Sequence, residues 1–110
     1  MPLFITYGSY SQSGIQGMLE KPADRAEVVR SMIEQAGGKL IELYMTTGDH
    51  DFVLISEAPD GELAVALGMV TAASGSVSDI ETVRAWTSAD FKGVTEKAAA
   101  LASTYKAPGS

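Results

Sequence analysis

The triplet Asp49-His50-Asp51 has the greatest chemical potential in the sequence, because it holds the only histidine of the chain. An imidazole that a carboxylate orients can act as a general base, so His50 is the candidate catalytic residue. Neighbouring residues on an extended chain point in different directions, so at most one flanking aspartate can orient it. The competing interpretation is a turn in which Asp49 bonds the backbone downstream and Asp51 anchors the following strand. A metal site is not expected, since no second histidine and no cysteine are available.

A second group combines charge with aromatic rings: Glu42, Tyr44, Arg84 and Trp86. Period-two alternation places Glu42 and Tyr44 on one face of a strand, and Arg84 and Trp86 on one face of another. In the functional interpretation they line a barrel-like cavity where Arg84 holds an anionic ligand. In the alternative, Glu42 and Arg84 form an ion pair between subunits, because interfaces are enriched in arginine and aromatic residues.

The first predicted strand adds tyrosines to the candidates. Thr6, Gly8 and Tyr10 share one face, and Tyr7 and Ser9 share the other. A glycine inside a strand indicates a bulge or a close backbone approach. Either Tyr7 or Tyr10 could line a pocket, or could simply pack in the core or an interface. The predicted ligand-binding residues are Tyr7, Tyr44, His50, Arg84 and Trp86.

These side chains need a scaffold, and hydrophobic periodicity predicts one. Alternation and β-branched content predict strands over 3–10, 39–47, 51–58 and 76–87. Helical spacing predicts helices over 23–36 and 62–74, and a last helix from residue 87 or 88 to 103. Before these, Ser11 or Ser13 could cap a first turn, which Pro22 would end.

The order βαββαβ followed by a helix predicts an α+β, ferredoxin-like domain with a four-stranded antiparallel sheet. We assign residues 1–103 to this single domain and residues 104–110 to a flexible tail. Helices would cover one sheet face, yet both faces of residues 52–55 are apolar. A bare apolar face marks an association surface, so we expect two sheets to face each other in a homodimer. The helix over 62–74 is apolar nearly all round and calls for a covering element or subunit.

The pattern "GGKLIELYMTTG-x-x-DFVLISEAPD", an alanine-rich helix with "ALG", and "E-T-V-R-A-W-T" resemble the small GYD-domain proteins over about residues 2 to 92. The resemblance implies a ferredoxin-like fold of the dimeric α/β-barrel type, widespread in bacteria and without a defined biochemical role. In the turn that names the family, Gly48 and Asp51 fit, and His50 stands where a tyrosine is expected. The resemblance therefore implies no catalytic role for His50.

Composition excludes several classes of partner. The net charge is −6, and the eight basic residues are scattered, which disfavours nucleic acids and anionic membrane surfaces. The chain has no cysteine, signal peptide or long apolar segment, which favours the cytoplasm. It also lacks glycine-rich nucleotide-binding motifs and asparagine, so no cofactor is expected and the known monooxygenase sites of the superfamily are not matched.

These observations predict a small cytoplasmic homo-oligomer that binds a small-molecule ligand or serves as an accessory protein. One alternative is a cofactor-independent dimeric α/β-barrel enzyme, an isomerase or monooxygenase acting on a small aromatic or lactone. Another is a structural module that builds larger assemblies from dimers. The enzyme alternative requires His50 and Arg84 to line one cavity of several hundred Å³.

Overall fold

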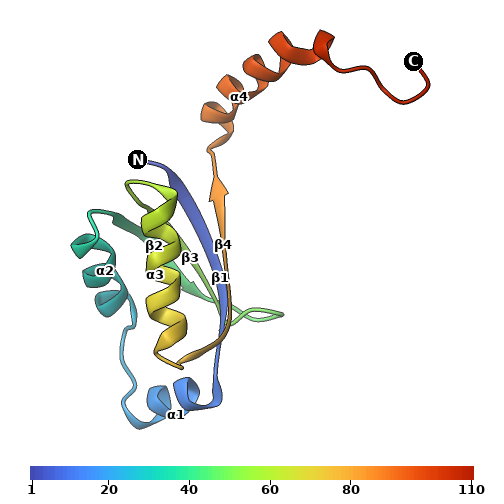
Figure 1. The fold of residues 1–110 in the computed structure, drawn as a ribbon. Helices are drawn as coiled ribbons and strands as arrows, with labels where there is room; N and C mark the ends of the chain where they lie inside the picture. Colours follow the sequence, from blue (N-terminus) through green and yellow to red (C-terminus); the bar gives the residue numbers. More distant parts are fainter.

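A single antiparallel sheet organises the chain in the computed structural model, which describes residues 1–110 (Figure 1). The strands are hydrogen-bonded in the order β2-β3-β1-β4, so β2 and β4 are the outer strands. This order confirms the predicted α+β, ferredoxin-like arrangement. The strands are β1 (Leu3–Tyr10), β2 (Lys39–Met45), β3 (Phe52–Glu57) and β4 (Val77–Ala85).

Helices α1 and α2 occupy the segment between β1 and β2, where the sequence predicted one helix over 23–36 preceded by a capped turn. The predicted cap and the end before Pro22 are confirmed in α1 (Gln12–Glu20), although its full length was not predicted, and α2 runs only over Ala26–Gln35. Ser11 caps α1 by accepting a hydrogen bond from the Gly14 backbone at 3.1 Å. The Ser11 hydroxyl also donates to the Gly75 carbonyl at 2.6 Å, which ties the start of α1 to the segment before β4.

The remaining helices are α3 (Gly61–Ala73) and α4 (Ser88–Leu101), followed by a 3-10 turn, η1 (Ala102–Thr104). Asp60 caps α3, accepting from the Leu63 backbone at 2.9 Å, and Thr87 caps α4 in the same way. Each cap satisfies an N–H group that the first helical turn leaves unpaired. None of the helices combines the length and apolar character that a membrane crossing requires.

The core lies between one sheet face and the helices α2 and α3 (Figure 1). Alternate residues of the central strands point into it, and Ile33 of α2 is its most deeply buried side chain. Gly8 of β1 also faces this side, and a Cβ atom there would lie 2.2 Å from the Phe52 ring. The group that approaches Gly8 closely is therefore a side chain, where the sequence had indicated a bulge or a close backbone approach.

The opposite sheet face carries no helix (Figure 1), and the residues at its centre are apolar. The register pairs Ile5 of β1 with Ile55 of β3 and with Val83 of β4, and pairs Tyr7 with Val53. Cross-strand partners project to the same side of a sheet, so these residues form one continuous surface. We call this surface the open face.

A bulge at Ile41 changes the facing of β2. The pairing with β3 shifts between Leu40 and Glu42, so Leu40 is buried on the helix side while Glu42 pairs with Ile55 on the open face. Strict alternation would place Leu40 on the same face as Glu42 and Tyr44, but the one extra residue of the bulge reverses the alternation and turns Leu40 to the other face. Glu42 and Tyr44 do share the open face.

Helix α4 stands away from the body as an arm (Figure 1). The chain measures 61 × 32 × 23 Å, and its radius of gyration is 17.8 Å. A compact chain of this length would have a radius of about 13 Å. Apart from η1, no element makes extensive contact with α4, and none of its residues is buried. The arm is consequently without a packing partner inside its own chain.

Candidate functional site

Backbone and side-chain hydrogen bonds fix the β2–β3 connection that carries His50. Gly48 adopts a φ of 97°, in the left-handed region that favours glycine. The Thr46 hydroxyl donates to the His50 carbonyl at 2.7 Å, and the Asp51 backbone N–H donates to the Gly8 carbonyl at 2.8 Å. The Asp51 carboxylate accepts from the Tyr10 backbone at 2.9 Å. Asp51 therefore anchors the connection to β1 and does not orient His50.

The acid that faces His50 comes from a distant part of the chain. Nδ1 of His50 lies 3.7 Å from Oδ2 of Asp79 in β4, and its ring lies 5.4 Å from the Tyr7 ring. Nδ1 is shielded from solvent and makes no hydrogen bond. The distance is too long for a hydrogen bond, so a small movement of either side chain would be needed to form one. Sequence reasoning missed Asp79 because only the sheet register brings it to His50.

Tyr7 and Tyr44 lie at the same end of the open face as His50. Both tyrosines are cross-strand partners of Val53, and they therefore flank it on the open face. The Tyr44 side chain is 52% exposed, although it is large and mostly apolar. Three of the five predicted ligand-binding residues therefore gather at one end of this surface.

Arg84 and Trp86 form the second group, where the sheet meets the arm. The guanidinium lies 4.3 Å from the Trp86 ring centroid and 5.9 Å from that of Phe4. Its Nη1 donates to the carbonyls of Leu3 and Ala85, and no carboxylate pairs with it within 4.0 Å. The stacking and the backbone bonds hold the charge in place without neutralising it.

An open hollow of about 340 Å³ lies beside Arg84 and Trp86. This volume falls within the range of roughly 300–1,000 Å³ that small-molecule sites occupy. The open-face residues Leu3, Ile41 and Ile55 supply apolar walls, and Glu57 and Asp90 place two carboxylates in the lining. The hollow can thus offer a cation, an aromatic ring and an apolar wall to a small molecule.

The two groups are not brought together within one chain. Arg84 pairs with Phe4 near the start of β1, whereas Asp79, which faces His50, pairs with Ser9 near its end. His50, Tyr7 and Tyr44 do not line the hollow beside Arg84. Glu42 and Arg84 stand on the two outer strands, so an ion pair between them remains a prediction for two subunits. A shared cavity would require a second chain.

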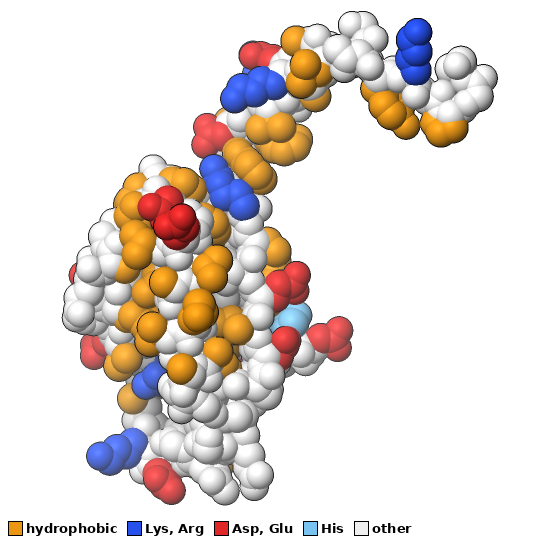
Figure 2. Space-filling view, in the orientation of Figure 1, with side chains coloured by type: hydrophobic (Ala, Val, Ile, Leu, Met, Phe, Trp, Pro, Cys, Tyr) orange, Lys and Arg blue, Asp and Glu red, His pale blue; other side chains and the backbone are white.

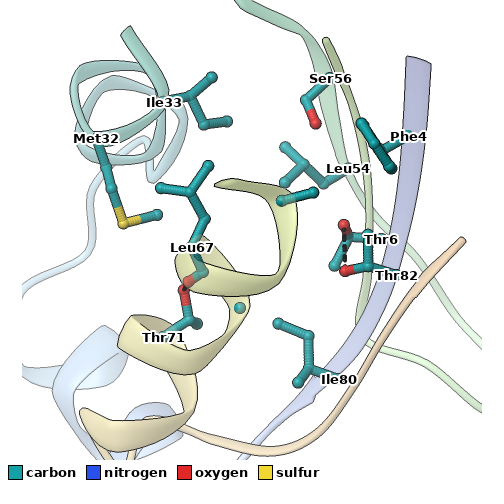
Figure 3. A pocket seen from close by; sticks show the side chains of 12 residues that line it. Phe4, Thr6, Met32, Ile33, Leu54, Ser56, Leu67, Thr71, Ile80 and Thr82 are labelled. Atoms are coloured by element: carbon teal, nitrogen blue, oxygen red, sulfur yellow. Dashed lines mark hydrogen bonds between the residues drawn. The ribbon is translucent and has the colours of Figure 1, made fainter. Parts of the chain in front are cut away.

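A third region, between the sheet and the helices, was not among the predicted sites (Figure 3). Two small hollows of about 40 and 80 Å³ lie there, and both are lined by Thr6, Thr71 and Ile80 among others. The hydroxyls of Thr6 and Thr82 are bonded to each other at 3.0 Å across the first hollow. The sequence signal for this region was the pair of threonines, Thr6 of β1 and Thr82 of β4, that face the helices, since apolar cores seldom contain threonine.

Tyr10 lines the larger of these hollows together with Arg25. Burial raises the pKa of the Tyr10 hydroxyl, the positive charge of Arg25 lowers it, and the negative charge of Asp51 raises it. The net direction is upward from 10.0, so the neutral phenol is favoured in the folded chain. No group of three or more His, Asp or Glu side chains lies in a metal-binding arrangement.

A comparison with known protein families identifies the family of this chain. The family model of the GYD domain matches residues 4–95, which include all four strands and the His50 turn. The chain belongs to the GYD-domain family. This GYD-domain protein has no match among curated proteins. The matched region ends within α4, so the second half of the arm lies beyond the family model.

A solved structure supports the fold. The GYD-domain protein resembles the crystal structure of TTHA0845 from Thermus thermophilus with a TM-score of 0.51 and 18% sequence identity. The superposition covers 80% of this chain and 96% of that one. At this identity the likeness extends to the fold alone.

Proposed function

We propose that this GYD-domain protein is a small homo-oligomer that binds a small-molecule ligand or serves as an accessory protein, with the open face as its principal interface. The observation that supports the proposal is the continuous apolar surface of Ile5, Val53, Ile55 and Val83, which no element of the chain covers. Covering such a surface is favourable by about 25 cal/mol per Å² of apolar area removed from water. The partner that we propose to cover this surface is the open face of a second copy of the chain.

The ligand is proposed to bind in the hollow beside Arg84 and Trp86. Its lining includes Leu3 and Ile55 of the open face, so a second sheet laid on that face would deepen the hollow. The unpaired guanidinium and the indole favour a small aromatic molecule that carries an anionic group. A cytoplasmic location is part of the proposal and is supported by the absence of cysteine.

Light scattering tests the interface. The wild-type chain at micromolar concentration is expected to have at least twice the monomer mass. Ile55→Glu should reduce the mass, because it places a charge in the centre of the open face. Val28→Glu is the matched control, since Val28 is 57% exposed on α2, away from the open face. A wild-type monomer, or equal masses for both variants, would refute the sheet-to-sheet interface.

Thermal unfolding with benzoate, salicylate and phenylacetate as probes tests the ligand site. A ligand at 100 times its dissociation constant stabilises the protein by about 2.7 kcal/mol. The stabilisation should be lost in Arg84→Ala and retained in the control Arg30→Ala. Loss in His50→Ala as well would place both groups in one chamber closed by two chains. Retention in both Arg84→Ala and His50→Ala would refute the proposed residues.

A cofactor-independent enzyme is the second candidate, and the His50–Asp79–Tyr7 cluster favours it. A carboxylate facing an imidazole beside a phenol can support proton transfer once the groups close to hydrogen-bonding distance. Against it, His50 and Arg84 lie apart in the single chain. The enzyme therefore depends on the sheet-to-sheet dimer, and Ile55→Glu, which disrupts that interface, should be inactive in any assay that detects turnover by the wild type.

A further inference from the structure

We propose that α4 is an intermolecular arm whose apolar stripe packs on the outer face of α3 in a second copy of this chain. This contact is distinct from the open face, and it involves a helix whose second half extends beyond the family match. Four observations support it: the stripe on α4, the uncovered face of α3, their matching dimensions, and the fixed direction of the arm.

The stripe on α4 has helical spacing. Phe91, Val94, Ala98 and Leu101 recur at intervals of three and four residues, so they lie along one side of the helix. Phe91 is 47% exposed and Leu101 is 62% exposed. Lys92 and Glu96 lie on the opposite side, where Nζ and Oε1 approach to 3.7 Å. The helix is thus amphipathic, although nothing in its own chain covers the apolar side.

The outer face of α3 is apolar as well, which is unusual for a helix that already packs on a sheet. Its inner side contributes Ala64 and Leu67 to the core region, while Val65, Met69 and Val70 are 62%, 67% and 60% exposed. No charged residue occurs in α3 after Glu62. Figure 2 shows hydrophobic side chains gathered over α3 and along the arm. The sequence had predicted a covering element for this helix, and the single chain provides none.

The two surfaces match in size, shape and charge. Helix α4 has 14 residues and α3 has 13, so both are roughly 20 Å long. Alanines on the outer side of α3 leave space for the larger Phe91 and Leu101. Neither surface contains a charge that would be buried without a partner. Since each copy carries both surfaces, a two-fold assembly makes the contact twice.

Side-chain packing at the base of the arm explains why the receiving helix belongs to a second copy. The Trp86 and Phe91 rings meet edge to face at 6.0 Å, and the Arg84 guanidinium stacks on the Trp86 ring at 4.3 Å. Arg84 is itself bonded to the Leu3 carbonyl at 3.2 Å. These contacts direct α4 away from its own α3 (Figure 1). Folding back onto the same chain would require breaking them.

Cysteine cross-linking tests the contact without background, because the natural chain has no cysteine. Met69→Cys marks the middle of α3, and Val94→Cys marks the middle of α4. Midpoints approach whether the helices run parallel or antiparallel. The two single variants, one carrying a mass tag, are mixed and oxidised, and the mixed dimer is quantified on a non-reducing gel. Glu96→Cys replaces Val94→Cys in the matched control, since it lies on the charged side.

The expected result is a mixed Met69→Cys/Val94→Cys dimer in several-fold excess over both homodimers and over the Glu96→Cys control. Equal yields with Val94→Cys and Glu96→Cys would overturn the proposal. So would a dilute double variant that closes its bond within one chain, since the arm would then fold back. Repeating the mixture with Ile55→Glu in both chains separates the two interfaces, because this change disrupts the open face and should leave the excess of the mixed dimer over the Glu96→Cys control unchanged.

Discussion

Single side chains set the geometry on both sides of the sheet. Gly8 admits the Phe52 ring on the helix side, and Asp51 ties the His50 connection to β1 beside it. On the open face, Asp79 approaches His50 because β1 and β4 are in the observed register. The same central strand therefore positions the core and the candidate polar cluster, so changes at its residues affect both.

Replacement of Gly8 by alanine should lower the free energy of unfolding by about 1–3 kcal/mol, the usual cost of overpacking a core. The added methyl would meet the buried Phe52 ring, which has little room to move. The double variant Gly8→Ala/Phe52→Leu should lose less than the sum of its single changes. Urea unfolding measures both quantities. Gly17→Ala is the control, because nothing lies within 4 Å of its added Cβ; strict additivity of the Gly8 and Phe52 changes would contradict the predicted clash.

Alkaline pH should destabilise the fold through Tyr10. Its folded pKa lies above 10.0, mainly because of burial, so the folded state holds this proton more tightly than the unfolded state. The resulting stabilisation is complete below the unfolded pKa and is lost as pH rises through the folded pKa. Urea unfolding between pH 8 and about 11 should therefore show a smaller loss in Tyr10→Phe than in the wild type. Tyr105→Phe, at a 74% exposed position, should behave like the wild type.

At the scale of elements, the chain consists of a packed body and a projecting helix. Helices α2 and α3 contact the sheet, whereas α4 is held mainly at its base by Trp86 and Phe91. Helices that lack tertiary contacts derive their stability from propensity and capping alone. Removing the cap of α3 and removing the cap of α4 should consequently change the free energy of unfolding of the body by different amounts.

Asp60→Ala should lower the free energy of unfolding of the body by about 1 kcal/mol, because it removes the cap of a helix that packs on the sheet. Thr87→Ala removes the cap of α4 and should leave the body unchanged in a monomeric background while reducing the helix content of the arm. Urea unfolding measures the first effect, and hydrogen exchange of the α4 amides measures the second. Equal destabilisation by both variants would mean that α4 unfolds together with the body.

Sequence patterns predicted the four strands and the long helices, because period-two and helical spacing survive wherever one face is buried. They failed where contacts from elsewhere decide local structure. Helix α1 depends on Ser11 bonding to Ser76 and Gly75, and the facing of Leu40 depends on a bulge defined only by pairing with β3. Tyr7, Tyr44 and Arg84 lie on their predicted strands and His50 in the predicted connection, whereas Trp86 follows the end of β4. The division of the candidates into two groups follows from strand register, which the sequence does not specify.

At the scale of the whole molecule, the protein presents three uncovered apolar surfaces: the open face, the outer side of α3 and the stripe of α4. Monomeric proteins seldom expose contiguous apolar patches larger than a few hundred Å². The chain also has a net charge of −6, which opposes unspecific association through mutual repulsion. Together these features favour an assembly with defined contacts.

Small-angle scattering should distinguish an extended arm from a folded one. At a dilution where light scattering reports a monomer, Ile55→Glu should have a radius of gyration close to 17.8 Å. Removing residues 88–110 from the same variant should reduce it to about 12 Å, the value for a compact chain of the remaining length. A full-length monomer near 13 Å would show that the arm folds onto its own body.

The bulge at Ile41 has a consequence for the kinds of aggregate that this chain avoids. Outer strands with free hydrogen-bonding groups can add further strands without limit and grow into fibrils. Here the bulge interrupts the ladder of β2, which also begins with Lys39, while Asp79 and Glu81 place charges along β4. Growth of the sheet through its edges is thereby hindered on both sides. The protein can keep apolar surfaces for finite, closed assemblies and still resist polymerising into ribbons.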